Sequence, residues 1–300
     1  MIRAACIGEC MVELRPAGGL YALGHAGDAF NTAVYLRREL GGKGEVAFVT
    51  AVGDDAPSRE LRAAIAARGI SDRWAFPVAG GSPGLYLIEL DAEGDRTFHY
   101  WRSASAARGW LRELQARGGA ELLAGSNLVY LSGVSLAILS PEDRAEALAL
   151  VAALRGRVGR IAFDPNVRPR LWPDLATAAE AALAAAACAD IVLPSTQDGE
   201  LLWGEADPAA QVRRWREAGA AEVALTQAAD GCRVAWPGGE AVVAAAAGVA
   251  VVDTSGGGDS FNGAYLAARL RGAEPEAAAR AGVALSAQVV GRPGALPEPA

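Results

Sequence analysis

Short apolar runs alternate with amphipathic segments along most of this 300-residue chain. The runs have the length of buried strands, and the segments between them repeat apolar residues at helical spacing. Because parallel strands need long crossover connections, the alternation predicts a largely parallel α/β sheet with helices on both faces. The expected strands are 3–8, 46–52, 128–131, 161–163, 191–193 and 222–225, and the expected helices are 28–40, 58–68, 141–154, 176–189, 257–270 and 275–290.

The composition fits a large buried core and argues against several classes of protein. Hydrophobic residues make up 52% of the chain, which is enough for a sizeable core. The 36 glycines and 15 prolines are too few for a collagen-like or disordered chain. The formal net charge of -7 at pH 7 argues against nucleic acid as a partner, because phosphate binding needs a basic face.

Missing residue types exclude other chemistries. Lys43 is the only lysine, and no Ser or Thr follows it, so the chain has no Walker P-loop. With only two histidines, His25 and His99, no H-E-x-x-H zinc motif is possible. The four cysteines form no C-x-x-C pair, so neither a zinc site nor a disulfide framework is expected.

No segment has the pattern of a membrane or export signal. Residues 1–6 lack the pattern of a secretory signal peptide. Apolar stretches such as 181–187 are too short to span a bilayer. We therefore expect a cytoplasmic protein with no membrane contact.

One segment departs from the strand–helix alternation. Residues 85–91 and 97–102 are strand-like, and the turn sequence at 92–95 between them predicts a β-hairpin. With residues near 11–23, this hairpin could form a small β lid that closes over a substrate. An antiparallel edge on the main sheet is the other interpretation, and the pattern alone does not separate the two.

The most informative stretch is the glycine-rich segment from Asp253 to Ala264. It follows an apolar, strand-like run at 249–252 and precedes an expected helix. Gly256, Gly257 and Gly258 would leave backbone N–H groups open at the positive end of the helix dipole, which suits a phosphate. Asp259 could then take a proton from an alcohol during phosphoryl transfer. The alternative is an ordinary glycine-rich turn in which Asp259 only favours the helix end.

The stretch from Asp253 to Asp259 resembles the second signature of the PfkB (ribokinase-like) carbohydrate kinases. The resemblance extends over nearly the whole chain and is most specific for the bacterial 2-keto-3-deoxygluconate kinases. Its other motifs are found at 8–14, 27–33, 83–86, 98–102, 131–141 and 163–172.

This resemblance implies a fold and an activity. The fold is a single ribokinase-like domain over 1–300, with a three-layer α/β/α core and a small β-sheet lid from approximately 11–25 and 73–103. The activity is ATP-dependent phosphorylation of the terminal hydroxyl of 2-keto-3-deoxygluconate, a step of sugar-acid catabolism. ATP and Mg²⁺ are the implied cofactors, and K⁺ is left open. Relatives often pair through their lids, which implies a homo-oligomer.

The resemblance also assigns roles to residues. Asp259 matches the catalytic base, and the three glycines before it match the anion hole. The implied substrate-binding residues are Gly27, Asp28, Asn31, Tyr86, Tyr100, Arg102, Asn166, Arg168 and Asp259. The chemistry of the substrate agrees, because guanidinium groups bind carboxylates in a planar, two-pronged way. Arg102 and Arg168 could therefore clamp a sugar acid from two sides, unless both are surface ion-pair formers.

The nucleotide half departs from the family pattern. The implied ATP-binding residues are Ser195, Thr226, Gly231, Gly256 and Gly258, and Ala228 stands where the family commonly has glycine. Asp198 could hold Mg²⁺ through water, with Glu200 as a rival. Asp253 falls where many relatives bind a monovalent cation. The first signature is also one glycine short, because Ala26 precedes Gly27.

Three other functions compete with this interpretation. A neutral-sugar kinase of fructokinase or ribokinase type would share the fold but would not need the arginine clamp. A non-catalytic sugar-acid sensor would not need Asp259 beside three glycines. A dinucleotide dehydrogenase would need G-x-G-x-x-G after the first strand, and the sequence has none there.

Overall fold

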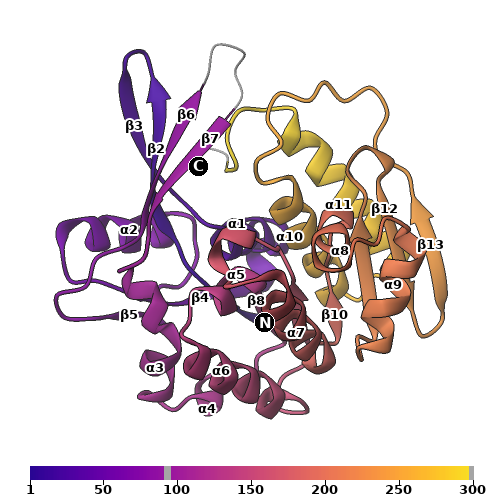
Figure 1. Ribbon diagram of the computed structural model, residues 1–300, viewed down its shortest axis with the longest axis horizontal. Helices are drawn as coiled ribbons and strands as arrows, with labels where there is room; N and C mark the ends of the chain where they lie inside the picture. Colours follow the sequence, from indigo (N-terminus) through magenta and orange to yellow (C-terminus); the bar gives the residue numbers. More distant parts are fainter. Residues whose placement is uncertain (91–95, 297–300) are drawn as a thin grey trace.

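The computed structural model describes residues 1–90 and 96–296, and its centre is a nine-stranded sheet (Figure 1). The strand order is β13-β12-β11-β10-β9-β8-β1-β4-β5. From β11 to β5 all pairs are parallel, whereas β12 and β13 are antiparallel. The strands are β1 (Ile2–Ile7), β4 (Gly44–Val52), β5 (Ala75–Pro77), β8 (Leu128–Ser132), β9 (Ile161–Asp164), β10 (Ile191–Val192), β11 (Glu222–Thr226), β12 (Cys232–Trp236) and β13 (Gly239–Val243).

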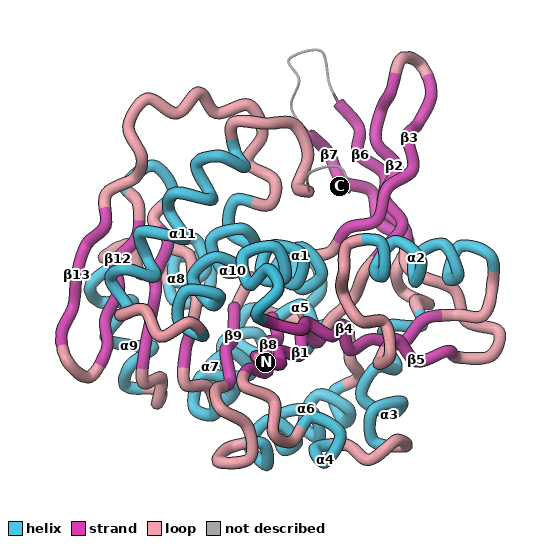
Figure 2. Tube along the Cα trace, turned by 180° about the vertical axis from the view of Figure 1, so that it is seen from behind, coloured by secondary structure: helices cyan, strands magenta, loops and turns pink. Residues whose placement is uncertain are grey.

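Helices cover both faces of this sheet (Figure 2), as the strand–helix alternation predicts. Apolar side chains of α1 (Asp28–Leu40), α2 (Ala56–Ala67), α10 (Gly257–Leu270) and α11 (Pro275–Val290) pack on one face. The other face is covered by α3 (Trp110–Gln115), α4 (Ala120–Leu123), α5 (Gly133–Ala137), α6 (Pro141–Leu154), α7 (Leu175–Cys188), α8 (Thr196–Trp203) and α9 (Pro208–Glu217). Short 3₁₀ turns lie at η1 (Gly41–Lys43), η2 (Ala106–Gly109), η3 (Pro169–Leu171) and η4 (Ala228–Asp230). The fold is therefore the expected three-layer α/β/α arrangement.

The expected hairpin belongs to a separate sheet and not to an edge of the main sheet. This lid has the order β3-β2-β6-β7, with β2 (Met11–Ala17), β3 (Leu20–Ala26), β6 (Leu85–Leu90) and β7 (Arg96–Trp101). A parallel pairing of β2 with β6 joins its two hairpins. In Figure 1 the four strands stand above the body at one side. The turn expected at 92–95 lies outside the described residues.

The prediction that the apolar run at 249–252 is strand-like is wrong. Val251 and Val252 lie in an irregular segment and are 63% and 57% exposed. The N–H of Val252 donates to the carbonyl of Val290 instead of to a neighbouring strand. An apolar run becomes a buried strand only where a sheet edge is free to receive it, and the last strands of this sheet are β12 and β13, which the alternation of runs did not predict.

In the part of the chain that the structure describes, no helix is long and apolar enough to cross a membrane.

Candidate active site

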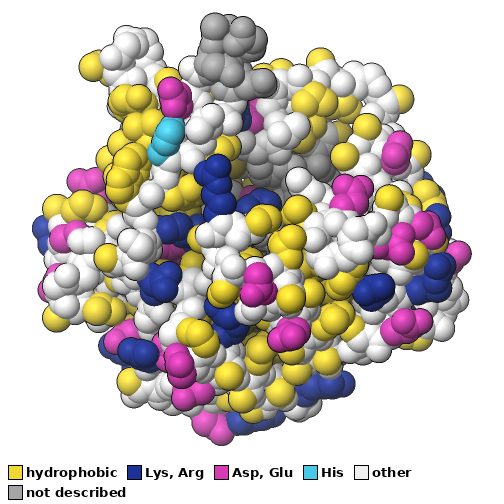
Figure 3. All heavy atoms as spheres, in the orientation of Figure 1, with side chains coloured by type: hydrophobic (Ala, Val, Ile, Leu, Met, Phe, Trp, Pro, Cys, Tyr) yellow, Lys and Arg dark blue, Asp and Glu magenta, His cyan; other side chains and the backbone are white. Residues whose placement is uncertain are grey.

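A cavity of about 1480 Å³ lies between the lid and the body. Besides the lid, the lining comes from Glu9 after β1, the start of α1, Val134 of α5, the loop after β9, the residues around the start of α10, and residues 293–295 after α11. In parallel α/β sheets ligands gather at the carboxyl ends of the strands, where the loop after β9 lies. Figure 3 shows Lys and Arg side chains gathered beneath the lid, around this hollow.

Most of the expected site residues line this cavity. From the start of α1 come Gly27, Asp28 and Asn31; from the lid Tyr86 and Tyr100, with Arg102 just after β7; from the loop after β9 Asn166 and Arg168; and from the α10 region Asp253, Gly256 and Asp259. The structure thus brings together residues that are up to 232 positions apart in the sequence, from Gly27 to Asp259.

Asp259 is held in place by Asn31. The side-chain N–H of Asn31 donates to Oδ2 of Asp259 at 2.8 Å, so the first turns of α1 and α10 meet at this carboxylate. Burial, and then the charge of Asp28, raise the pKa of Asp259 from 3.8 to about 7, against the hydrogen bond from Asn31 and the charge of Arg168. A carboxylate with a pKa near neutrality is suited to accept a proton at the operating pH.

The start of α10 leaves two backbone donors open. Gly256 caps the helix in the left-handed region at φ 74°, and a Cβ there would come within 2.5 Å of the carbonyl oxygen of Ala295. The N–H of Gly257 donates to Thr254, whereas those of Gly258 and Asp259 donate to no described residue. Gly258 is exposed with open space around it. Unpaired N–H groups at a helix start form an anion site.

Asn166 links the loop after β9 to the start of α1. Its side-chain N–H donates to Oδ2 of Asp28 at 2.7 Å. Its own backbone is in the left-handed region at φ 34°, which asparagine tolerates better than most residues. The backbone N–H of Asn166 donates to Oδ1 of the buried Asp164, the last residue of β9. Asp28 is therefore fixed from across the cavity.

The two lid tyrosines differ in their freedom to meet a ligand. The Tyr86 hydroxyl is buried and donates to Glu13, a carboxylate that also pairs with Arg15 at 2.9 Å. Tyr100 is 47% exposed, and its hydroxyl has no hydrogen-bonded partner among the residues that the structure describes. Of the two hydroxyls, only that of Tyr100 is available to a ligand without displacing a protein partner.

Arg102 already has a counter-ion. It forms an ion pair with Glu9, which directly follows the Gly8 at the end of β1 and is 1% exposed. Burial raises the pKa of Glu9, and the charge of Arg102 opposes this shift. Of the two arginines expected to clamp a sugar acid, Arg102 therefore has its charge neutralised by a carboxylate of the protein.

Arg168 and Arg170 also line the cavity, and neither pairs with a carboxylate of the described residues. Both are exposed at or next to η3, and no ion pair joins either of them to another described residue. The charge that remains for an anionic ligand is therefore on the body side of the cavity.

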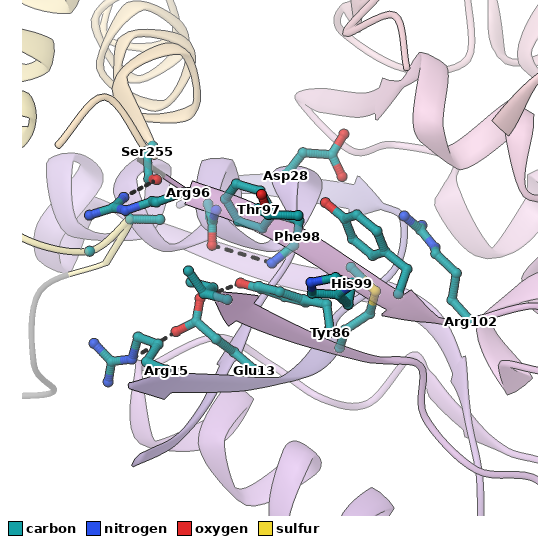
Figure 4. Close-up of a pocket in the computed structure, with 18 of the residues that line it drawn as sticks. Glu13, Arg15, Asp28, Tyr86, Arg96, Thr97, Phe98, His99, Arg102 and Ser255 are labelled. Carbon is teal, nitrogen blue, oxygen red and sulfur yellow. Dashed lines mark hydrogen bonds and ion pairs between the residues drawn. The ribbon is translucent and has the colours of Figure 1, made fainter. Parts of the chain in front are cut away.

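Arg96 and Arg102 lie at opposite ends of β7 (Figure 4). Arg96 forms an ion pair with Asp253, whose side chain is fully buried, and donates to Oγ of Ser255 at 2.9 Å. The same lid strand is thus tied at both ends to carboxylates of the body.

Of the expected ATP-binding residues, Gly256 lines the cavity, whereas Ser195, Thr226 and Gly231 lie outside it. Ser195 and Thr226 form an isolated bridge at the carboxyl ends of the neighbouring strands β10 and β11. Gly231 follows η4 at φ 93°, where a Cβ would come within 2.1 Å of the carbonyl oxygen of Val243. The structure places these residues together on the same sheet edge, apart from the lid.

Asp198 holds the chain in place by its hydrogen bonds. Its Oδ1 accepts from the N–H of Val167 at 2.7 Å, and its Oδ2 accepts from the backbone and hydroxyl of Ser195. It does not line the cavity, and its rival Glu200 is exposed on α8. Asp198 therefore positions the loop that carries Asn166 and Arg168.

Several cavity residues were not predicted as site residues from the sequence, among them the charged Glu9, Glu13, Arg96 and Arg170. Glu9 and Glu13 follow the first strand in the motif from Gly8 to Leu14, so an acidic residue in a buried run was the available signal. Nothing in the sequence indicated Arg96, because its partner Asp253 is 157 residues away.

Comparisons with known proteins agree with this geometry. The family model described as "pfkB family carbohydrate kinase" matches residues 1–300. A curated relative, 2-dehydro-3-deoxygluconokinase of Dickeya dadantii, is 39% identical over 297 residues, which cover 97% of this chain and 96% of the relative.

Solved structures show the same fold. A PfkB protein from Polaromonas sp. JS666 has a TM-score of 0.84 at 26% identity, covering 97% of this chain and 96% of that one. A double mutant of fructokinase from Vibrio cholerae, solved in a fructose-, ADP- and potassium-bound form, has a TM-score of 0.82 at 22% identity, covering 98% and 94%.

Proposed function

The chain belongs to the pfkB family of carbohydrate kinases, and from this membership we propose that it phosphorylates 2-keto-3-deoxygluconate with ATP. The product is 2-keto-3-deoxy-6-phosphogluconate. A curated relative that is 39% identical over nearly the whole chain is named 2-dehydro-3-deoxygluconokinase. This is the systematic name of the same activity. The observation in the structure that supports it best is Asp259, a carboxylate with a pKa of about 7 beside open amides in the cavity.

Asp259 acts as the general base in this proposal. It accepts the proton of the terminal hydroxyl as the oxygen attacks the γ-phosphorus. The new bond joins that oxygen to phosphorus, the bond from the γ-phosphorus to the bridging oxygen breaks, and ADP leaves. Asn31 fixes the carboxylate through its 2.8 Å hydrogen bond, so the base is positioned before the substrate arrives.

The start of α10 fits the phosphates of ATP. The open N–H groups of Gly258 and Asp259 can hold the charge that develops on the transferred group. In this proposal the adenosine end lies toward Ser195, Thr226 and Gly231, on the same sheet edge.

Magnesium fits as an ion that enters with the nucleotide. No group of three or more His, Cys, Asp or Glu side chains among the described residues could hold a metal ion alone. Mg²⁺ keeps several waters and commonly binds through phosphates and one or two carboxylates. When bound, it neutralises the phosphate charge. Asp198 could contribute only through water, because protein donors occupy both of its oxygens.

The unpaired arginines favour an acidic sugar over a neutral one. Arg168 and Arg170 bring two positive charges to the cavity, and no carboxylate of the described residues pairs with either of them. A sugar acid supplies the missing carboxylate, and guanidinium binds carboxylate with two parallel hydrogen bonds. Tyr100 and Arg102 then complete the lid side of the substrate pocket.

A substrate panel with a catalytic variant tests this function. ATP-dependent phosphate transfer is measured on 2-keto-3-deoxygluconate, fructose and ribose, with the product identified by mass spectrometry. The acid should be preferred, and Asp259→Asn should lower kcat by about 10²- to 10⁴-fold without loss of folding. Asp54→Asn, which changes an exposed aspartate outside the cavity, is the matched control.

The panel also separates the alternatives. Equal turnover of fructose and the acid would support a neutral-sugar kinase. Binding of the acid without any ATP-dependent product would support a sensor.

The lid also supports the expected homo-oligomer. Its edge strand β3 exposes Leu20, Tyr21 and Leu23, and edge strands with exposed apolar residues are commonly covered by another chain. Light scattering of the purified protein, compared with Leu23→Glu, tests whether a second copy covers this strand.

A further inference from the structure

The residues around Asp253 do not fit the free monovalent cation that the sequence resemblance leaves open. Oδ1 of Asp253 accepts from Arg96 and from the N–H of Ser255 at 2.9 Å, and Oδ2 accepts from the N–H of Gly294. Burial alone would raise the pKa of Asp253, but the hydrogen bonds from Arg96, Ser255 and Gly294 lower it overall. The carboxylate is thus ionised and already holds a cation of the protein.

That cation comes from the lid. Arg96 is the first residue of β7, whereas Asp253 and Ser255 precede the start of α10. The guanidinium bridges the two parts, because it forms an ion pair with Asp253 and also donates to the hydroxyl of Ser255, the second contact being drawn in Figure 4. Ser255 directly precedes Gly256, the cap of α10, so the contact reaches the anion site itself.

We propose that Arg96 is a positioning residue that takes the place of a monovalent cation on Asp253, so that closure of the lid itself orders the anion site at the start of α10. An open lid withdraws the guanidinium and leaves the buried Asp253 without a cation. A buried unpaired carboxylate is costly, so the segment before α10 reaches its ordered form only with the lid closed. A second ion pair, from Arg102 just after β7 to Glu9, holds the other end of the strand to the body.

Cation dependence of the proposed kinase reaction tests this inference, which rests on the function proposed above. Wild-type kcat/KM should be the same in potassium, sodium and tetramethylammonium chloride at equal ionic strength. Arg96→Ala should lose about 10- to 100-fold in kcat/KM in tetramethylammonium chloride, because it removes hydrogen bonds to a charged group. Potassium or guanidinium chloride should restore part of this loss, because a small cation can enter the vacated space.

Two further variants distinguish a positioning role from a general loss of structure. Arg96→Lys keeps a cation and should retain more activity than Arg96→Gln, which has a similar length without the charge. Arg73→Gln removes an arginine that pairs with Glu45 outside the cavity and is the matched control. It should behave like the wild type in every salt.

A readout without substrate separates failure of this inference from failure of the proposed function. In thermal unfolding of the ligand-free protein, potassium should raise the Tm of Arg96→Ala above its value in tetramethylammonium chloride and should leave the wild type unchanged. A wild type that is activated or stabilised by potassium overturns the inference. An Arg96→Ala variant as active as the wild type in tetramethylammonium chloride does so as well. If no sugar acid is phosphorylated, only the proposed function fails. The thermal unfolding measurement still decides whether Arg96 takes the place of a monovalent cation.

Discussion

At the scale of single residues, the environment of Asp259 predicts a pH dependence. Burial and then the charge of Asp28 raise its pKa from 3.8 to about 7. The base must be ionised, so kcat/KM should rise with pH through a step near 7. Asp28→Asn removes one of the two causes and should move this step to lower pH, as measured by pH–rate profiles.

The test is the pH at which kcat/KM rises, and not the size of kcat/KM, because Asp28 also lines the substrate cavity and its substitution can lower kcat/KM directly. Asp54→Asn should leave the step in place, and an unmoved step in Asp28→Asn would contradict the electrostatic argument.

The raised pKa of Asp259 also makes the stability of the fold depend on pH. Because the folded pKa lies above the ordinary value, the folded chain binds the proton more tightly. The contribution of Asp259 to stability therefore falls as pH rises from 3.8 to about 7.

Replacing Ala228 by glycine should make the fold more stable. Ala228 stands where the family commonly has glycine, yet its backbone is left-handed at φ 47°. Such a backbone costs about 1–2 kcal/mol for a residue with a Cβ, whereas glycine adopts it freely. Ala228→Gly should raise the free energy of unfolding by up to about 1 kcal/mol, after the entropy cost of glycine is subtracted. Ala229→Gly, one residue later in the same 3₁₀ turn, is the control and should be neutral or destabilising in urea unfolding.

At the scale of elements, the placement of α1 depends on Gly27. A Cβ there would come within 2.2 Å of the carbonyl oxygen of Glu9. Gly27→Ala should therefore displace the start of the helix, which carries Asp28 and Asn31. We expect a loss of about 1–3 kcal/mol in unfolding and a lower kcat. Gly42→Ala has open space around its Cβ and should change neither quantity, so equal effects of the two substitutions would refute this account.

How well each element could be predicted depended on whether its signals are local. The bounds of α1, α6, α10 and α11 agree with the sequence prediction because glycine, proline or a capping side chain marks their ends, as Ser140 does for α6. The run at 249–252 failed because its strand character depended on a free sheet edge, which is a property of the whole fold. The sequence does not decide between a separate lid and an edge of the main sheet, because the two hairpins of the lid pair only through β2 and β6.

The site shows the same division. Asp259 and the glycines before it could be predicted because one short motif carries them. The ion pairs of Arg96 and Arg102 could not, because each depends on a partner about 90 to 160 residues away.

At the scale of the whole molecule, the distribution of charge predicts a salt effect. The chain carries a net charge of -7, and both ATP and a sugar acid are anions. Arg168 and Arg170, which no carboxylate of the described residues neutralises, offset this repulsion locally at the cavity. Arg170→Gln should raise KM for the sugar acid by about 3- to 10-fold with little change in kcat.

Added salt should narrow this difference between wild type and variant, because ions screen exposed charges. Arg108→Gln removes an exposed arginine that does not line the cavity and should leave KM unchanged. An effect of Arg170→Gln on kcat alone would contradict the role of Arg170 in attracting the substrate.

The lid is made from two stretches of chain with α1, η1, β4, α2 and β5 between them. During synthesis the hairpin of β2 and β3 therefore leaves the ribosome long before β6 exists to pair with Val12–Leu14. Until then its free edge can join any exposed strand, including that of a neighbouring nascent chain. The separation of the two lid hairpins in the sequence therefore leaves the edge of β2 unpaired during synthesis, and open to pairing with another chain until β6 has been made.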